Sequence, residues 1–119
     1  MKWKKAPEEL VVFLADKMKN IDCEYKKMFG YPAYFINGNM FAGLFADNLF
    51  LRLSESDRES IVKLQPSIKV LEPQPGRAMK EYIVVPKTLY QNKSFFDKWL
   101  SRSIDYASSL PPKKKKQKG

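Results

Sequence analysis

The dipeptide Asn37-Gly38 constrains the fold of this chain more than any other feature of its sequence. It separates two apolar segments, residues 34–36 and 40–46, whose side chains favour extended backbone. Asparagine followed by glycine favours the type I′ turn, because both central residues of that turn adopt positive φ. Residues 33–46 are therefore predicted to form a β-hairpin, which requires an antiparallel sheet.

Three further segments extend this sheet. Residues 49–53 alternate leucine with phenylalanine and arginine, directly after Asp47-Asn48, a pair that tolerates the left-handed backbone of a second turn. Residues 68–71 and 79–85 are rich in β-branched and aromatic side chains, and a segment with two prolines and Gly76 separates them. The sequence thus predicts a sheet of about five strands.

Three other segments have the spacing of helices that cover one side of a sheet. Residues 7–20 begin with a proline and two glutamates, which suit a helix N-terminus, and residues 92–109 repeat large apolar side chains at helical spacing. Residues 55–65 follow Ser54, a predicted N-cap with Asp57 three positions on. The order helix, three strands, helix, two strands, helix predicts a two-layer α+β fold, an antiparallel sheet with helices on one face.

The net charge of +9 is concentrated at the two ends of the chain. Residues 1–5 contain three lysines and residues 113–118 contain five, so that 14 of the 22 basic residues remain elsewhere, against 13 acidic residues. We therefore predict a basic N-terminal end at residues 1–6, one folded domain at 7–110 and a disordered lysine-rich tail at 111–119.

The lysine-rich tail could bind nucleic acid. Its lysines can neutralise phosphates without reading sequence, which would give binding that weakens steeply with salt. The residues concerned are Lys113, Lys114, Lys115, Lys116 and Lys118. Non-specific nucleic-acid association through the lysine-rich ends is therefore an alternative function, and a purely solubilising end is the competing interpretation.

The sequence contains no histidine, the residue on which most general-base, nucleophilic and metal-binding sites depend. Cys23 is the only cysteine, and its acidic neighbours Asp22 and Glu24 are expected to raise the thiol pKa and suppress the reactive thiolate. The spacing of the five glycines matches neither the phosphate loop nor the dinucleotide fingerprint. We therefore predict no catalytic residue, cofactor or metal, and a protein that is not an enzyme. A small-molecule site that uses Cys23, carboxylates or Lys80 is the least favoured alternative.

Hydropathy and cysteine usage bear on location. No apolar run approaches the roughly 20 residues that span a bilayer, and the first residues contain no signal-like apolar segment. A single cysteine excludes an intramolecular disulfide and agrees with a reducing compartment. The sequence predicts a cytoplasmic protein without a membrane role.

Arg77 and Lys80 are the candidate contact residues of the folded domain. Gly76 permits a chain reversal that would expose Arg77 beside a strand end, together with Lys80. A guanidinium in that position can bind an anionic group of a ligand or partner.

Several short motifs follow one another in an order that is more specific than any one of them. They are Met28-Phe29-Gly30, Asn37-Gly38-Asn39-Met40-Phe41-Ala42, Leu49-Phe50-Leu51-Arg52-Leu53, Gly76-Arg77-Ala78-Met79, Tyr82, Val85-Pro86 and Trp99. Over roughly residues 8–108 this order resembles the N-terminal domain of the TfoX/Sxy family of competence regulators.

The resemblance implies a two-layer, secretion-chaperone-like fold and a link to the regulation of natural competence. It implies a non-enzymatic binding or regulatory module with an unidentified protein partner, and a homodimer is an open alternative. The chain departs from the family at Tyr31-Pro32, where a second glycine is common, and at Arg52, where lysine is common. The full regulators carry a second, helical domain, whereas 119 residues leave room for one domain.

Overall fold

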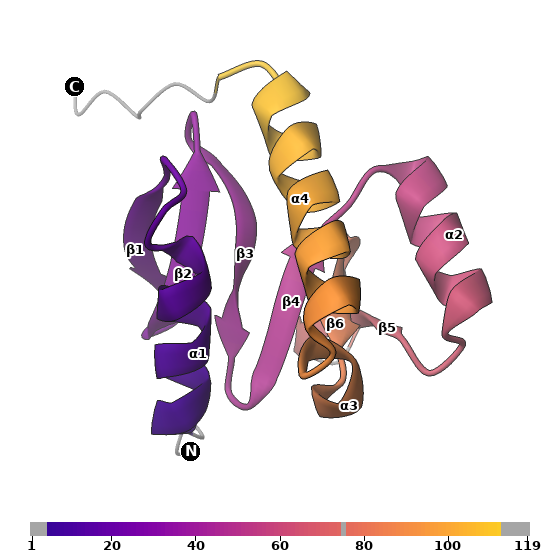
Figure 1. Ribbon diagram of the computed structural model, residues 1–119, viewed down its shortest axis with the longest axis horizontal. Helices are drawn as coiled ribbons and strands as arrows, with labels where there is room; N and C mark the ends of the chain where they lie inside the picture. The colour runs from indigo at the N-terminus through magenta and orange to yellow at the C-terminus, as the bar shows by residue number, and fades with distance from the viewer. Residues whose placement is uncertain (1–4, 75, 113–119) are drawn as a thin grey trace.

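An antiparallel sheet of six strands runs through the part of the chain that the computed structural model describes, residues 5–74 and 76–112. The strands are β1 (Glu24–Met28), β2 (Tyr31–Ile36), β3 (Asn39–Phe45), β4 (Asn48–Arg52), β5 (Lys69–Gln74) and β6 (Arg77–Val85). The helices are α1 (Glu8–Met18), α2 (Glu55–Leu64), α3 (Lys87–Tyr90) and α4 (Lys93–Ser109). The strand order β1-β2-β3-β4-β6-β5 places β1 and β5 at the two edges (Figure 1).

The predicted α+β fold with an antiparallel sheet is confirmed, with one strand more than expected. The additional strand is β1, whose sequence contains one glutamate and two lysines among five residues. Four of its five side chains are exposed, so it shows none of the apolar alternation by which strands are recognised. The structure also contains a short helix that was not predicted, α3, directly before α4.

Two turns of the sheet show how far local sequence sets the backbone. Asn37 and Gly38 have φ of 53° and 80°, as a type I′ turn requires, and the predicted β2–β3 hairpin is confirmed. The predicted turn at Asp47-Asn48 is wrong by one residue. Ala46 takes the positive φ, at 56°, and β4 already begins at Asn48. Alanine gives no sequence signal for that conformation.

Helices α1 and α4 lie across one face of the sheet and enclose the main core (Figure 1). Phe96 of α4 and Leu44, Leu49 and Leu51 of the central strands are fully buried there. Burying a side chain of this size contributes about 1.5–3 kcal/mol. Ser103 on the inner side of α4 is also buried, and its hydroxyl donates to the Phe41 carbonyl oxygen at 2.8 Å. The helix is thus fixed on β3 by packing and by one buried hydrogen bond.

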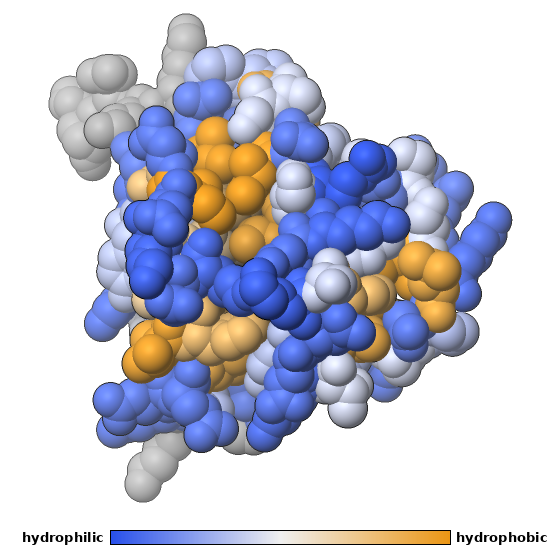
Figure 2. Space-filling model, viewed as in Figure 1, coloured by the Kyte–Doolittle hydropathy of each residue, from blue (hydrophilic) through white to orange (hydrophobic). Residues whose placement is uncertain are grey.

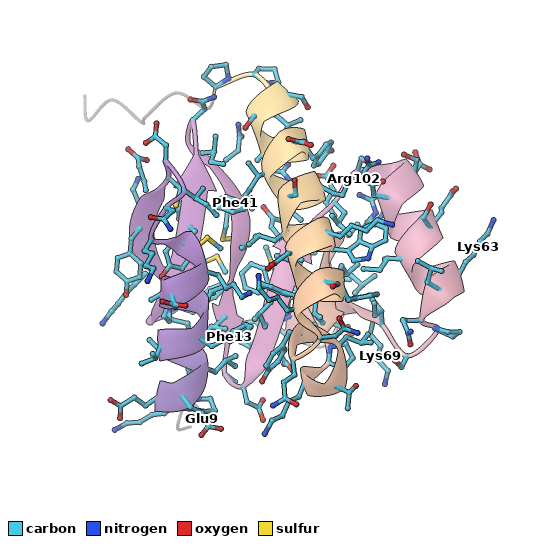
Figure 3. The ribbon with its side chains drawn as sticks, viewed as in Figure 1. Glu9, Phe13, Phe41, Lys63, Lys69 and Arg102 are labelled. Carbon is cyan, nitrogen blue, oxygen red and sulfur yellow. The ribbon has the colours of Figure 1, made fainter. Side chains whose placement is uncertain are left out.

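An ion pair fastens α2 to α4. Both carboxylate oxygens of the buried Asp57 accept hydrogen bonds from the Arg102 guanidinium, at 3.0 and 2.6 Å. Arg102 lies on the side of α4 that faces α2 (Figure 3). Ser54 Oγ accepts a hydrogen bond from the Asp57 N–H at 3.3 Å, which confirms the predicted N-cap.

The outer side of α2 exposes Val62 and Leu64, and an apolar patch lies over this helix in Figure 2.

The opposite face of the sheet carries a second apolar cluster, to which no helical residue of the described chain contributes. Ala33, Met40, Phe50 and Leu71 are buried in it. The half-buried side chains packed against them are Met28, Phe35, Phe45, Met79, Tyr82 and Val84. We call this side of the sheet the helix-free face.

Close packing on the helix-free face depends on Gly43 of β3. Gly43 pairs with Phe50 on one side and with Ala33 on the other. A Cβ at this position would lie 2.8 Å from Phe50 Cζ and 2.8 Å from the Pro32 carbonyl oxygen. The missing side chain therefore makes the space that the Phe50 ring occupies.

We expect Gly43→Ala to destabilise the domain by about 1–3 kcal/mol, because the new methyl group overpacks a backbone contact that cannot move freely. Denaturant unfolding of the two proteins measures the difference. Phe50→Leu removes Cζ, so its effect should be less than additive with Gly43→Ala. A Gly43→Ala protein as stable as wild type would show that the sheet can absorb the side chain.

Candidate binding surface

Both predicted contact residues of the folded domain are exposed and lie on β6. The predicted chain reversal precedes them: Gly76 has a φ of +80°, and its N–H donates to Glu72 Oε2 at 2.6 Å. Gln74 pairs with Arg77 across this hairpin. The turn therefore presents Arg77 at the tip of the β5–β6 hairpin, while Lys80 follows further along the strand.

A hollow of about 260 Å³ opens beside Arg77. It is lined by Phe29, Phe45, Pro73, Gln74, Arg77 and Met79. Phe29 belongs to the β1–β2 turn and Phe45 ends β3, and their rings meet edge to face with centroids 5.7 Å apart. Because residues near both edges of the sheet line one hollow, the sheet curls at this end. Lys80 is not among the described lining residues, so the structure does not join Arg77 and Lys80 in one hollow.

The guanidinium of Arg77 has no hydrogen bond or ion pair with any residue in 5–74 or 76–112. The surrounding side chains are apolar apart from Gln74. A charge-assisted, bidentate hydrogen bond to a carboxylate is the interaction that a guanidinium in such a setting forms best.

The helix-free face beyond the hollow is rich in methionine. Met28, Met40 and Met79 come from three different strands, and Phe35 and Tyr82 lie among them. Unbranched thioether side chains adapt to differently shaped partners, and exposed methionine surfaces are typical of proteins that bind varied apolar segments. Since two of these methionines are only half-buried, apolar surface remains for such a contact.

Basic side chains border this apolar surface. Residues directly opposite one another on antiparallel strands point to the same face, and Lys69 stands opposite Val84 of the helix-free cluster. Lys26 Nζ lies 5.5 Å from the centroid of the Phe35 ring on the same face. With Arg77 at the hollow, these lysines place three basic side chains along the border, where Glu24, opposite Phe35, adds one acidic side chain. The basic side chains favour acidic partners.

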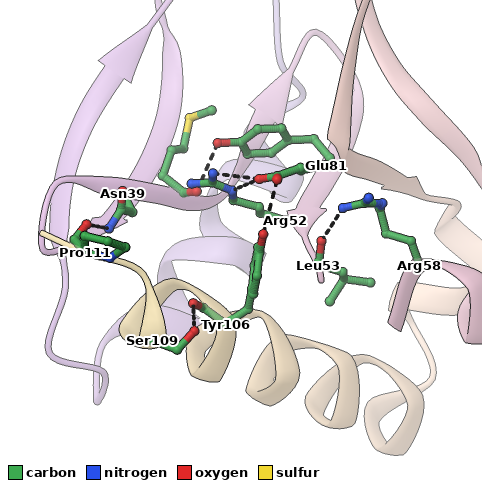
Figure 4. A network of polar contacts seen from close by, with 10 residues as sticks. Asn39, Arg52, Leu53, Arg58, Glu81, Tyr106, Ser109 and Pro111 are labelled. Atoms are coloured by element: carbon green, nitrogen blue, oxygen red, sulfur yellow. Dashed lines mark hydrogen bonds and ion pairs between the residues drawn. The ribbon is translucent and has the colours of Figure 1, made fainter. Parts of the chain in front are cut away.

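Arg52 is also on this side but is neutralised within the domain. Its guanidinium contacts Glu81 Oε1 at 2.7 Å through Nε and at 2.6 Å through Nη2 (Figure 4). It also lies over the rings of Tyr82 and Tyr106, 5.4 and 5.7 Å from the centroids. The Tyr106 hydroxyl donates to the other Glu81 oxygen at 3.2 Å, and the Tyr82 hydroxyl donates to the Met40 carbonyl oxygen at 3.2 Å. The network thus links α4 to the helix-free face.

The network changes the acidity of Glu81. Burial disfavours the charged carboxylate, but the hydrogen bond and the charge of Arg52, together with the Tyr106 hydroxyl, outweigh that effect and lower the pKa of Glu81 below its ordinary value of 4.5. Glu81 therefore stays ionised at neutral pH and acts as the anchor of the network.

Cys23 lies in a second hollow, of about 450 Å³, between the start of β1 and the β2–β3 turn. Burial first, and the charge of Asp22 second, raise the pKa of the Cys23 thiol. The predicted direction is confirmed, although Asp22 acts without a contribution from Glu24. Within the described residues, no group of three His, Cys, Asp or Glu side chains could hold a metal ion.

The five tail lysines, Lys113 to Lys116 and Lys118, and the first four residues of the basic N-terminal end lie outside the described residues. The last described residues are held close to the sheet, because Asn39 Nδ2 donates to the Pro111 carbonyl oxygen at 3.1 Å (Figure 4). Pro112 contributes to the hollow at Cys23. The chain thus leaves the described domain beside the β2–β3 turn.

Comparison with known protein families matches residues 18–107 to the TfoX N-terminal domain. The matched span contains all six strands and most of α4. The chain belongs to the TfoX N-terminal domain family. The comparison with curated proteins and the comparison with solved structures each gave no match. In this TfoX N-terminal domain, the Arg77 hollow and the Arg52–Glu81 network both fall inside the family's span, whereas α1 lies almost entirely before it.

In the described residues no helix of this TfoX N-terminal domain is long and apolar enough to cross a membrane. The sequence did not indicate that Phe29 and Phe45 line a hollow with Arg77, since both are remote from it along the chain. The sequence signal for Phe29 is Gly30, which favours a turn directly after it. In the structure Phe29 adopts a φ of 57°, which is rare for a bulky residue.

We expect Glu81→Gln to lower stability at neutral pH by 1 kcal/mol or less, on the order of a partly exposed ion pair. Because the folded-state pKa of Glu81 is lowered, its contribution is present above the unfolded-state value near 4.5 and disappears as pH falls through the folded-state pKa. Denaturant unfolding at neutral and acidic pH should therefore show a gap between wild type and variant that closes in acid. A gap that persists unchanged in acid would contradict this origin.

Proposed function

We propose that this TfoX N-terminal domain is a non-enzymatic binding module, and that its helix-free face holds an acidic, apolar segment of a partner protein. The main support for this proposal is the hollow at Arg77. There, a guanidinium without a partner in the described chain lies beside Phe29, Phe45 and Met79. An apolar side chain fits the hollow, and a neighbouring carboxylate reaches the guanidinium.

The expected strength of this contact is that of a regulatory interaction. Removing one large apolar side chain from water contributes about 1.5–3 kcal/mol, and a hydrogen bond to a charged group contributes about 1.5–3 kcal/mol. Side-chain ordering opposes both contributions, so the contact is reversible. Membership of the TfoX N-terminal domain family supports a role in the regulation of competence.

A protein segment fits the helix-free face better than a nucleic acid does. Base stacking requires aromatic rings with an exposed face. Phe50 is fully buried and its ring meets Tyr82 edge to face, and Lys26 lies over Phe35. Phe29 is the exposed ring at the hollow, and the half-buried Met28 and Met79 lie on the same face, a mixture that suits apolar side chains of a protein. Nucleic-acid association through the tail lysines is the second candidate, supported by the clustering of positive charge there.

The test uses synthetic peptides of two kinds, one alternating leucine with aspartate and one alternating leucine with lysine. We expect the acidic peptide to shift the backbone amide resonances of Phe29, Phe45 and the β5–β6 hairpin in the full chain. Arg77→Glu should weaken that binding by about tenfold or more, equivalent to about 1.4 kcal/mol. Lys98→Glu, which makes the same charge change on the exposed side of α4, is the matched control and should leave the affinity unchanged.

Three outcomes would overturn the proposal: equal binding of both peptides, resonance shifts confined to the helix side, or no effect of Arg77→Glu. The nucleic-acid candidate is measured separately with single- and double-stranded oligonucleotides over a range of salt. Salt-sensitive oligonucleotide binding that is lost on deletion of residues 113–119, without peptide binding, would favour that candidate instead.

A further inference from the structure

The outer edge of β1 is a self-complementary pairing edge, and we propose that it joins two copies of this chain into a dimer. The two β1 strands run antiparallel and are centred on Tyr25, so that Glu24 of each copy stands opposite Lys26 of the other. This inference rests on the sheet edge and its charges and does not depend on the binding function proposed for the helix-free face.

The two edges of the sheet differ in their fitness for pairing. Edge strand β5 contains Pro73 and has two register shifts against β6, features that hinder the addition of another strand. Edge strand β1 contains no proline and pairs with β2 over five consecutive residues without a shift. Four of its five side chains are exposed, and no strand within the described residues lies on its outer side. Of the two edges, β1 is therefore the one suited to the addition of another strand.

The hairpin geometry decides which backbone groups of β1 face outward. Met28 and Tyr31 flank the two-residue turn Phe29-Gly30 and so form the hydrogen-bonded pair that closes the hairpin. Hydrogen-bonded and non-hydrogen-bonded pairs alternate along an antiparallel ladder. The N–H and C=O groups of Tyr25 and Lys27 consequently point away from β2, toward the open edge.

Among the registers that a two-fold axis permits, one sets opposite charges of β1 directly opposite each other. Such an axis is perpendicular to the sheet, so each strand meets its copy about a single residue that faces itself. Pairing about Lys26 or Lys27 would set two lysines directly opposite, and pairing about Glu24 would set two glutamates opposite. Pairing about Tyr25 sets Glu24 opposite Lys26 twice, at the non-hydrogen-bonded positions where side chains are closest.

The Tyr25 register also suits the backbone and the aromatic side chain. Tyr25 then faces its copy at a hydrogen-bonded position, which uses its outward N–H and C=O groups. Tyr25 is about half exposed, with a relative accessible area of 53%, and its ring packs on Tyr34 at a centroid distance of 5.5 Å. The dimer would cover that ring and form one continuous sheet, with both helix-free faces on the same side.

Edge lysines commonly protect a strand from unwanted pairing, and here they permit one register and oppose the neighbouring ones. A two-fold contact closes on itself, so it yields a dimer and no filament. Five residues on each side bury less than a standard interface of about 1,600 Å². The dimer should therefore dissociate on dilution and weaken with salt.

Sedimentation equilibrium of the full chain over a range of concentrations tests this pairing. Wild type should approach twice the monomer mass of 13.9 kDa at high concentration. Glu24→Lys and Lys26→Glu each place like charges opposite one another, and each should be monomeric at concentrations where wild type is dimeric. An equimolar mixture of the two variants should form a heterodimer, and the double variant should recover the homodimer. Lys27→Glu, opposite Cys23 in this register, is the matched control and should dimerise like wild type.

A disulfide test examines the register itself. In a Cys23→Ser background, Tyr25→Cys should cross-link two copies under oxidising conditions, because residues facing each other at a hydrogen-bonded position have Cα atoms about 5.5 Å apart. Lys27→Cys in the same background should cross-link far less, since its copy lies several residues away. A monomeric wild type, single charge variants that dimerise normally, or a mixture that stays monomeric would each overturn the proposal. Thermal unfolding of every variant establishes that it is folded.

Discussion

The pairing of β3 between β2 and β4 is the constraint on which the rest of the structure depends. Six of the seven β3 residues are buried, which is possible only because both faces of this strand are covered. Helix α4 packs on one face, fixed to it by the buried Ser103–Phe41 hydrogen bond. Phe50 covers the other face at Gly43, where any side chain would collide. The two apolar clusters of the domain are therefore separated by the thickness of one strand.

The two faces of the sheet are covered by other side chains to different degrees. On the helix side, Leu10, Leu14 and Met18 of α1 join α4 in covering the strands. On the other side, only strand residues supply the cluster among the described residues, and its outer members remain half-buried. Curling of the sheet brings Phe29 and Arg77 to one hollow but does not close it. The apolar surface that remains is the physical basis for expecting a partner there.

How much the sequence predicts depends on whether a feature is local. The Asn37-Gly38 turn and the Ser54 cap follow from short-range chemistry, and both are confirmed. Strand β1 was missed because an edge strand can satisfy its backbone on one side without apolar alternation. The positive φ of Ala46 is imposed by the hairpin and not by the residue. The exposure of Arg77 was predictable from Gly76, whereas its aromatic neighbours arise from the curvature of the whole sheet.

The Arg52–Glu81–Tyr106 network gives the two faces of the sheet a common polar connection. Arg52 and Tyr82 stand opposite each other on β4 and β6, and the guanidinium lies over both the Tyr82 and the Tyr106 rings. Tyr106 belongs to α4, whereas Tyr82 packs in the helix-free cluster and bonds to the backbone of Met40. A displacement of Tyr82 or Met40 by a bound segment would therefore disturb contacts that position the C-terminal half of α4. Charged groups held in one geometry thus link α4 to the helix-free face.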